Sequence, residues 1–300
     1  MSVRAIVGVA LALLCAACSN ASKTPQSSLD KLGMTKGEQV KVVTTISTLN
    51  SLVKGVGGDR VSVQNIVPVG ASPETFQPAP QDVALVADAQ LLVENGAGLE
   101  TWLEKTLSNA ANANLKTVVG SDGLSVVNDN PHLWMDPVNA KHYVLQIRDG
   151  LVAVDPTHAD EYRKNADAYN KKLDALQKSI QAKIDTIPPA HRYMIVFHNA
   201  FQYYNARFGL NTLGFVERNP GQEPNPQQIA GLIDLAKQHG VKAVFSEPEY
   251  SPKLLYSIAQ GAGVHVVENL YDDSIGTDPR VGTYPAMLQF DTDTIVASLK

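Results

Sequence analysis

The sequence predicts an α/β fold: two α/β lobes with mainly parallel sheets, joined by one long rigid helix, with a ligand site in the cleft between them. Short β-branched segments alternate with helical segments in both halves of the chain, which is typical of βαβ units and parallel sheets. A single long helical pattern separates the two halves and ends at Pro188-Pro189. Ligands of open α/β sheets bind at the carboxyl ends of strands, so residues that follow strands are the candidates for function.

The first lobe is expected over 40–155. It begins with a β-branched strand, VKVVTTIS, followed by a helix that ends at Gly57-Gly58. A second strand over 61–67 runs into the turn signal Pro68-Val69-Gly70. The other elements predicted for this lobe are a helix over 80–89, a strand over 91–94, a helix over 99–107 and a strand over 115–119.

A linking helix is expected over 156–187. Asp155-Pro156 predicts its start, because Asp caps the free N–H groups of a first turn and Pro fits the first helical position. A helix of about thirty residues would be on the order of 45 Å long, more than one compact lobe requires. Its apolar residues form one stripe at helical spacing: Tyr162, Tyr169, Leu173, Leu176, Ile180 and Ile184.

The second lobe is expected over 188–300 and repeats the α/β alternation. Its first strand, over 193–197, leads into a helix, and a helix that begins near Thr283 closes the chain. Between these two ends the pattern predicts strands over 211–217, 241–246 and 264–269, and helices over 199–208, 226–238 and 251–261.

The N-terminal residues are expected to form a targeting signal. Residues 5–14 are apolar, enough for a signal peptide and too few to span a membrane. Ala16-Ala17-Cys18 resembles the lipobox of bacterial lipoproteins, which implies a signal peptide over 1–18 and lipidation of Cys18. Cys15 stands where that motif usually has Leu, so a plain secretory signal is the alternative. The polar stretch 19–39 is expected to be a flexible tether, and the protein to be extracytoplasmic and lipid-anchored.

Composition excludes some classes of function. The net charge is −5 and the sequence contains no cluster of Lys and Arg residues. Nucleic-acid-binding proteins have such a cluster, so we do not expect nucleic-acid binding. The sequence contains no H-E-x-x-H, G-x-S-x-G or P-loop motif, and we therefore do not expect an enzyme.

Four ionisable residues lie where the chain leaves a predicted element: Glu74, His132, His198 and Asp273. Singly, each is explained as a cap or a hydrogen-bonded core residue. The segments around them occur in a specific order: VPVGASPETFQPAPQDVALVADAQLLVENGAGLETWLEK, PHLWMDP, FHNAFQYYNARFGL, EPNPQQIAGLIDLAKQHGVKAVFSEPEYSPKL and DDSIG. From residue 40 to the C-terminus, this pattern resembles the periplasmic or surface metal-binding proteins of zinc and manganese ABC transporters, the cluster A-I family.

The resemblance implies one divalent metal ion held between the lobes by two ligands from each. By motif, the second, third and fourth ligands are His132, His198 and Asp273, with Asp272 as a rival to the last. The first ligand of the family is a His, and Glu74 stands in its place. Glu74 is expected to coordinate, and the alternatives are a three-ligand site completed by water or the recruitment of a neighbouring residue. Glu247 is expected to orient a ligand rather than to contact the metal.

The donor set of two imidazoles and two carboxylates favours Mn²⁺ over Zn²⁺, with Fe²⁺ a further candidate, because carboxylates suit harder ions. Zn²⁺ nevertheless binds most N/O sites more tightly than Mn²⁺. The expected partners are an ABC permease and its ATPase, and the protein is expected to be a monomer. Four alternatives remain open: a zinc-specific member, a metal-dependent hydrolase with an open coordination position, an adhesin, and a siderophore- or haem-binding relative.

Overall fold

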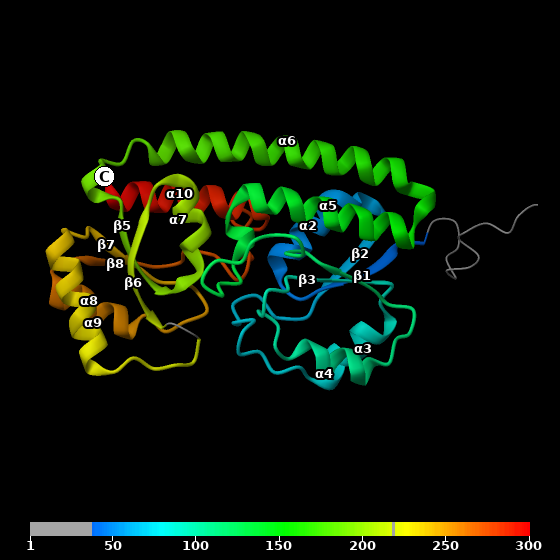
Figure 1. Ribbon diagram of the computed structural model, residues 1–300, viewed down its shortest axis with the longest axis horizontal. Coiled ribbons are helices and arrows are strands. Elements are labelled where there is room, and N and C mark those ends of the chain that lie inside the picture. The colour runs from blue at the N-terminus through cyan, green and yellow to red at the C-terminus, as the bar shows by residue number, and fades with distance from the viewer. Residues whose placement is uncertain (1–37, 218–219) are drawn as a thin grey trace, which may run out of the picture.

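The computed structural model describes residues 38–217 and 220–300 and has two lobes, each built on a four-stranded sheet of parallel strands (Figure 1). This confirms the predicted α/β fold class. The expected signal peptide at 1–18, Cys18 and nearly all of the tether at 19–39 lie outside the described residues. Within the described part of the chain, no helix combines the length and apolarity needed to cross a bilayer.

The first sheet has the order β2-β1-β3-β4, so its two central strands are the earliest and the third along the chain. Val42 and Val43 of β1 and Leu91 to Val93 of β3 are almost completely buried, as expected for strands covered on both faces. The elements of this lobe are β1 (Val40–Thr44), α2 (Ser47–Gly57), β2 (Val61–Asn65), α3 (Pro80–Asp88), β3 (Leu91–Glu94), α4 (Leu103–Ala110), β4 (Lys116–Val119) and α5 (Pro137–Val154).

Helix α4 begins four residues later than the sequence pattern predicts. Gly96, Ala97 and Gly98 all have positive φ, so the chain turns where the helix was expected to start. The carboxylate of Glu100 stabilises this turn by accepting hydrogen bonds from the backbone N–H groups of Asn95 and Gly96.

The second sheet has the order β6-β5-β7-β8, with β5 in the centre. Strand β5 ends at His198, and the segment that contains Asp273 lies between β8 and α10. The elements of this lobe are β5 (Tyr193–His198), α7 (Gln202–Phe208), β6 (Asn211–Glu217), α8 (Pro226–His239), β7 (Ala243–Phe245), α9 (Lys253–Ala262), β8 (His265–Val267) and α10 (Tyr284–Leu299).

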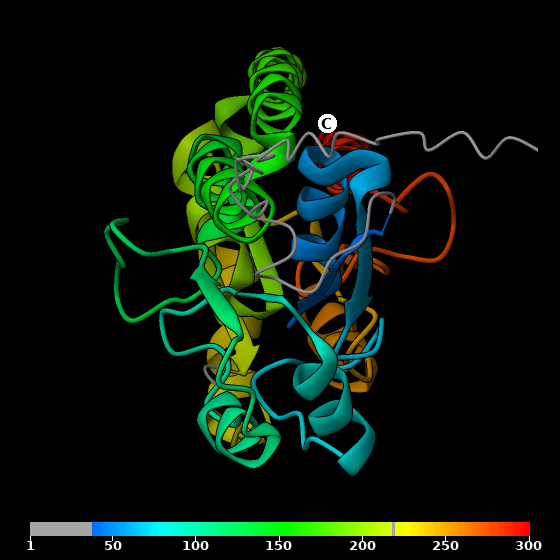
Figure 2. The same cartoon turned by 90° about the vertical axis from the view of Figure 1, so that its right-hand side faces the viewer.

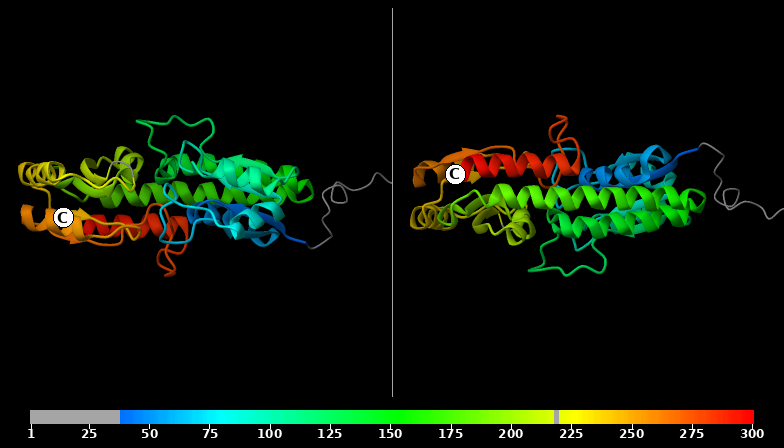
Figure 3. Two further views of the ribbon diagram at one scale, coloured as in Figure 1. Left: turned by 90° about the horizontal axis from the view of Figure 1, so that it is seen from below. Right: turned by 90° about the horizontal axis from the view of Figure 1, so that it is seen from above.

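Helix α6 (Ala159–Ile184) runs along both lobes, with a 3-10 turn over Pro156–His158 before it (Figures 1 and 3). The predicted apolar stripe is its buried face, with Ala166 in addition. It packs on α2 and α5 of the first lobe and on α7 and α10 of the second. These side chains belong to one hydrophobic core that contains residues of both lobes, so α6 and this core hold the lobes together.

The segment between β4 and α5 projects from the body of the protein as a long loop (Figures 2 and 3). Asn128 and Asp129 in this loop have positive φ. Tyr203 of α7 holds the loop, because its hydroxyl accepts a hydrogen bond from the N–H of Val127 and donates one to the carbonyl oxygen of Asn130. The loop leads directly into Pro131-His132, so its attachment to the second lobe places that histidine.

Candidate metal centre

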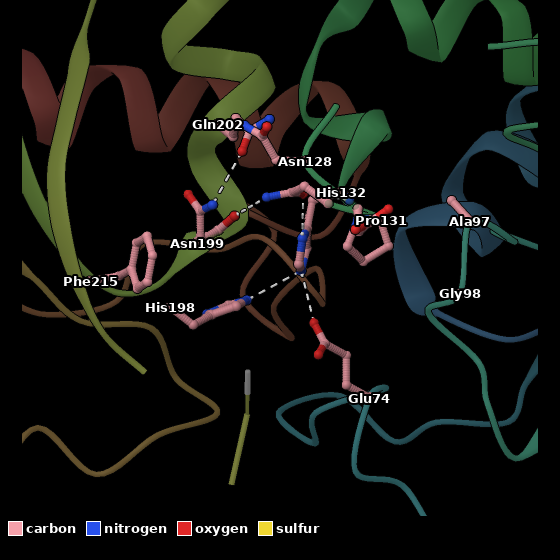
Figure 4. A pocket seen from close by; sticks show the side chains of 12 residues that line it. Glu74, Ala97, Gly98, Asn128, Pro131, His132, His198, Asn199, Gln202 and Phe215 are labelled. Carbon is pink, nitrogen blue, oxygen red and sulfur yellow. Dashed lines mark hydrogen bonds and ion pairs between the residues drawn. The ribbon is translucent and has the colours of Figure 1, made fainter. Parts of the chain in front are cut away.

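The side chains of His132, His198, Glu74 and Asp273 converge between the lobes. The Nε2 atoms of His132 and His198 lie 3.3 Å apart. Nε2 of His132 lies 3.3 Å from Oδ1 of Asp273 and 3.6 Å from Oε1 of Glu74. Nε2 of His198 lies 3.8 Å from Oδ2 of Asp273. Figure 4 shows the two imidazoles and the Glu74 carboxylate pointing toward one another.

Three of these four separations match those between ligand atoms around one ion, and the fourth, between His198 and Asp273, is slightly longer. A tetrahedral site with bonds of 2.0–2.2 Å places adjacent ligand atoms about 3.3–3.6 Å apart. Both carboxylate oxygens of Asp273 are buried and lack a hydrogen-bond partner, as does Nδ1 of His198. Buried polar atoms without partners are costly, and a cation among them would satisfy the carboxylate. The residues present therefore fit a divalent metal ion.

Asn130 determines which ring nitrogen of His132 faces the centre. Oδ1 of Asn130 lies 3.0 Å from the backbone nitrogen of His132 and 2.9 Å from its Nδ1. Since an amide oxygen only accepts, Nδ1 carries the proton, and the lone pair of Nε2 faces the centre. Nδ2 of Asn130 donates to the carbonyl oxygen of Asn199, the residue after His198, at 2.5 Å. One amide thus connects the segments of both histidines.

The outer nitrogen of His198 faces two buried carboxylates. Its Nδ1 lies 3.8 Å from Oε2 of Glu247 and 3.8 Å from Oδ2 of Asp272. Both acids are almost completely buried. Carboxylates on the outer nitrogen of a metal-binding imidazole orient the ring and increase its basicity. Glu247 thus lies where an orienting residue would lie, and Asp272 lies on the same side of His198 rather than at its Nε2.

Burial and neighbouring charges raise the pKa values of some residues of the centre and lower that of another. Burial raises the pKa of Asp272 and of Glu247. Burial alone would lower the pKa of His198, but the carboxylates of Asp272, Glu247 and Asp273 outweigh it and hold that pKa well above its usual value. Burial alone would raise the pKa of Asp273, but the adjacent imidazoles of His132 and His198 hold that pKa below its usual value.

No Lys or Arg side chain in the described part of the chain pairs with these acids. Another acid, Glu249, lies beside them, and burial together with the charge of Asp273 raises its pKa to about 7. A buried group of acids with no basic partner other than imidazole carries excess negative charge, which a divalent cation would offset.

A cavity of about 910 Å³ opens onto the centre from the side of the long loop (Figure 4). Glu74, His132 and His198 line this cavity together with four amide side chains and one further carboxylate: Asn128, Asn130, Asn199, Gln202 and Asp129. The cavity therefore connects solvent to the candidate ligands.

Sequence reasoning missed Asn130 and Glu249 as neighbours of the centre. Asn130 could have been considered, because it stands two residues before His132 and an Asn side chain there reaches the imidazole. Glu249 carried no such signal. The five other histidines of the chain do not join the groups of candidate ligands found among residues 38–217 and 220–300: His142, His158, His191, His239 and His265.

Residues 42–298 match the family model described as "Zinc-uptake complex component A periplasmic" (ZnuA). The chain is 33% identical to the "Manganese-binding lipoprotein MntA" of Halalkalibacterium halodurans, over 88% of this chain and 89% of that protein. It is 30% identical to the "Iron-binding protein YfeA" of Yersinia pestis, over 86% of each. A Mn-bound periplasmic metal-binding protein from Candidatus Liberibacter asiaticus superposes with a TM-score of 0.78 at 26% identity, covering 87% of this chain and 100% of that one.

The family model covers nearly the whole described chain, and both relatives align over most of their length. The resemblance seen in the sequence is thereby confirmed. The chain belongs to the ZnuA family of periplasmic metal-uptake components.

Proposed function

We propose that this protein captures one divalent transition metal ion outside the cytoplasm and delivers it to the permease of an ABC importer. The observation that carries the proposal is the convergence of four side chains from both lobes: His132, His198 and Asp273 lie 3.3–3.8 Å from one another, and Glu74 lies 3.6 Å from His132. The names of its relatives, which bind manganese or iron, support it. Glu74, His132, His198 and Asp273 are the proposed ligands.

We propose Mn²⁺ as the preferred ion, ahead of Zn²⁺, with Fe²⁺ as a third candidate. Two carboxylates supply up to four oxygen atoms, and carboxylate-rich sites suit Mn²⁺. Two imidazoles alone would favour Zn²⁺, which is ahead of Mn²⁺ in intrinsic affinity at most N/O sites. The preference for Mn²⁺ therefore depends on both Glu74 and Asp273.

The arrangement of residues at the centre agrees better with metal binding for transport than with catalysis by a bound metal. A catalytic metal needs an open coordination position and a nearby general base. Two imidazoles and two carboxylates are available as ligands, and two other buried acids, Glu247 and Asp272, face the outer nitrogen of His198 instead of the centre. We therefore propose a binding protein and not a hydrolase.

Release of the ion would follow local movements. Helix α6 and the core shared by the lobes oppose a large hinge motion. The Glu74 loop and the loop that carries Asp273 are irregular segments, so they are the parts that can shift a ligand when the protein meets its permease. Anchoring through lipidated Cys18, a monomeric state and a partner ATPase complete the proposal.

The test is metal analysis of the protein purified without added metal, followed by competition between Mn²⁺ and Zn²⁺. We expect one ion per wild-type chain. Glu74→Ala is expected to weaken Mn²⁺ binding by more than tenfold, because one of four ligands is lost. Glu104→Ala, at an exposed position of α4, is the matched control and is expected to bind like the wild type. Unchanged stoichiometry and affinity in Glu74→Ala would remove that residue from the ligand set.

A further inference from the structure

The two tryptophans of the chain make the same contact on two different loops. The indole N–H of Trp102 donates to the carbonyl oxygen of Pro73 at 2.8 Å. The indole N–H of Trp134 donates to the carbonyl oxygen of Asp272 at 2.9 Å. Pro73 directly precedes Glu74, and Asp272 directly precedes Asp273. Each indole therefore holds the peptide group from which a proposed carboxylate ligand extends.

Trp134 connects the lobes at this point. It is completely buried and lies two residues after His132, and its ring centroid is 5.1 Å from that of His132. The hydroxyl of Tyr284 donates to its carbonyl oxygen at 2.6 Å, which fixes its backbone. Its N–H then reaches across to the loop of Asp273. The indole thus sets the distance between the His132 segment and a ligand loop of the other lobe.

Trp102 holds the Glu74 loop at two places. Besides the hydrogen bond to Pro73, its ring packs edge-on against Phe76, with centroids 5.2 Å apart and planes at 68°. Among the described residues, no other hydrogen bond reaches the backbone of the segment from Pro73 to Pro78. Since Glu74 is not in a helix or strand, the indole is the main restraint on its backbone.

We propose that Trp102 and Trp134 are positioning residues that place the carboxylates of Glu74 and Asp273, and that they thereby set the preference for Mn²⁺ over Zn²⁺. The inference rests on the proposed function. Metal ligands must be held within about 0.5 Å of their productive positions. The two imidazoles keep affinity for Zn²⁺ when a carboxylate shifts, whereas Mn²⁺ depends on the oxygen donors. Loss of an indole N–H should therefore weaken Mn²⁺ binding more than Zn²⁺ binding.

The experiment measures dissociation constants for Mn²⁺ and Zn²⁺ in the full mature protein and in two kinds of variant. Trp102→Phe and Trp134→Phe remove the N–H together with part of the ring. Incorporation of 3-benzothienylalanine at either position removes the N–H and keeps the bicyclic shape, so it decides the result where a Phe variant fails to fold. We expect the Mn²⁺ affinity to fall at least about fivefold more than the Zn²⁺ affinity. A fivefold change corresponds to the free energy that one hydrogen bond typically contributes.

Tyr162→Phe is the matched control, because it deletes a buried hydrogen bond, from the Tyr162 hydroxyl to Asp155, far along α6 from the centre. It is expected to leave the ratio of the two affinities unchanged. If the benzothienyl variants lose Mn²⁺ and Zn²⁺ affinity equally, or lose neither, the inference is overturned and the tryptophans are only core residues. A wild type that binds neither ion would instead overturn the proposed function, so the two failures are distinguishable.

Discussion

The Nε2 atoms of His132 and His198 lie 3.3 Å apart, although the first histidine belongs to the N-terminal lobe and the second ends the central strand of the other sheet. Asn130 fixes the proton of His132 on Nδ1, so its Nε2 presents a lone pair. A second nitrogen at this distance is compatible with a proton or a cation between the rings. We therefore expect protons and the metal ion to compete for this pair of nitrogen atoms.

Replacing either histidine is expected to abolish high-affinity binding. His132→Ala and His198→Ala each remove a nitrogen ligand, and we expect Mn²⁺ and Zn²⁺ to bind at least ~100-fold more weakly, measured by competition with a chelating dye. His265→Ala removes an exposed imidazole of β8 and serves as the control with unchanged affinity. Retention of wild-type affinity in His198→Ala would show that the third ligand lies elsewhere.

Binding is expected to weaken as the pH falls. The carboxylates around His198 hold its pKa well above the usual value, so in the metal-free protein at neutral pH this imidazole keeps a proton that the ion must displace. For each proton displaced, the affinity falls about tenfold per pH unit below that pKa. Competition titrations from pH 5 to 7.5 measure the slope, and calorimetry in buffers of different ionisation enthalpy counts the released protons.

A pH-independent affinity over this range, with no proton release, would contradict ligation by His198. The exposed-site control His265→Ala is expected to give the same slope as the wild type. In His198→Ala, the slope of log affinity against pH is expected to be smaller by about one, because the proton that competed with the ion has been removed.

The parallel sheets and α6 could be predicted because their signals are local. The stripe from Tyr162 to Ile184 has strict helical spacing, and the same side chains form the buried face of α6. The start of α4 was placed too early, since nothing in the residues 99–102 themselves opposes a helix. The turn there depends on the carboxylate of Glu100 accepting from Asn95 and Gly96, a tertiary feature.

The candidate ligands were found through motifs, whereas their supports were not. Trp102 and Trp134 are large apolar residues, for which burial is the ordinary outcome, and both are buried. Their hydrogen bonds to Pro73 and Asp272 join residues 29 and 138 positions apart. Contacts between residues so far apart in the sequence depend on how helices, strands and loops pack in three dimensions. They cannot be predicted from the spacing of residues along the chain.

Two helical glycines are expected to respond in opposite ways to alanine. A Cβ on Gly55 of α2 would lie 2.2 Å from Cε2 of Tyr169, which is buried against α2 from α6. We expect Gly55→Ala to lower the free energy of unfolding by about 1–3 kcal/mol through overpacking. A Cβ on Gly231 of α8 meets no atom within 4 Å, so Gly231→Ala is expected to stabilise by about 1 kcal/mol through helix propensity.

Chemical denaturation followed by circular dichroism measures both changes. If Gly55→Ala were as stable as Gly231→Ala, the close packing of α6 on α2 would be refuted. Metal affinity is expected to stay near the wild-type value in Gly231→Ala, because α8 contributes none of the proposed ligands.

An ion pair between the lobes is expected to contribute to stability more than an equivalent pair in solvent. Arg207 of α7 contacts both carboxylate oxygens of Asp136, at 2.7–3.0 Å, and Asp136 also caps α5 by accepting from the N–H of Val138. The Asp136 side chain is 7% exposed and that of Arg207 is 37% exposed, so solvent screens the pair in part. We expect Arg207→Ala to cost about 1 kcal/mol, and Arg207→Lys to recover only part of it, since an ammonium group cannot make the forked contact.

Arg280→Ala is the matched control for this prediction. Arg280 likewise contacts both carboxylate oxygens of Asp278, but the exposed fractions of the two side chains are 75% and 43%. Its loss is expected to leave the melting temperature unchanged, because exposed pairs contribute little. Calorimetric melting at low and high salt compares the two variants. Since Asp136 follows His132 by four residues and Arg207 follows His198 by nine, equal melting temperatures for both variants would mean that this contact does not help to hold the two histidine segments together.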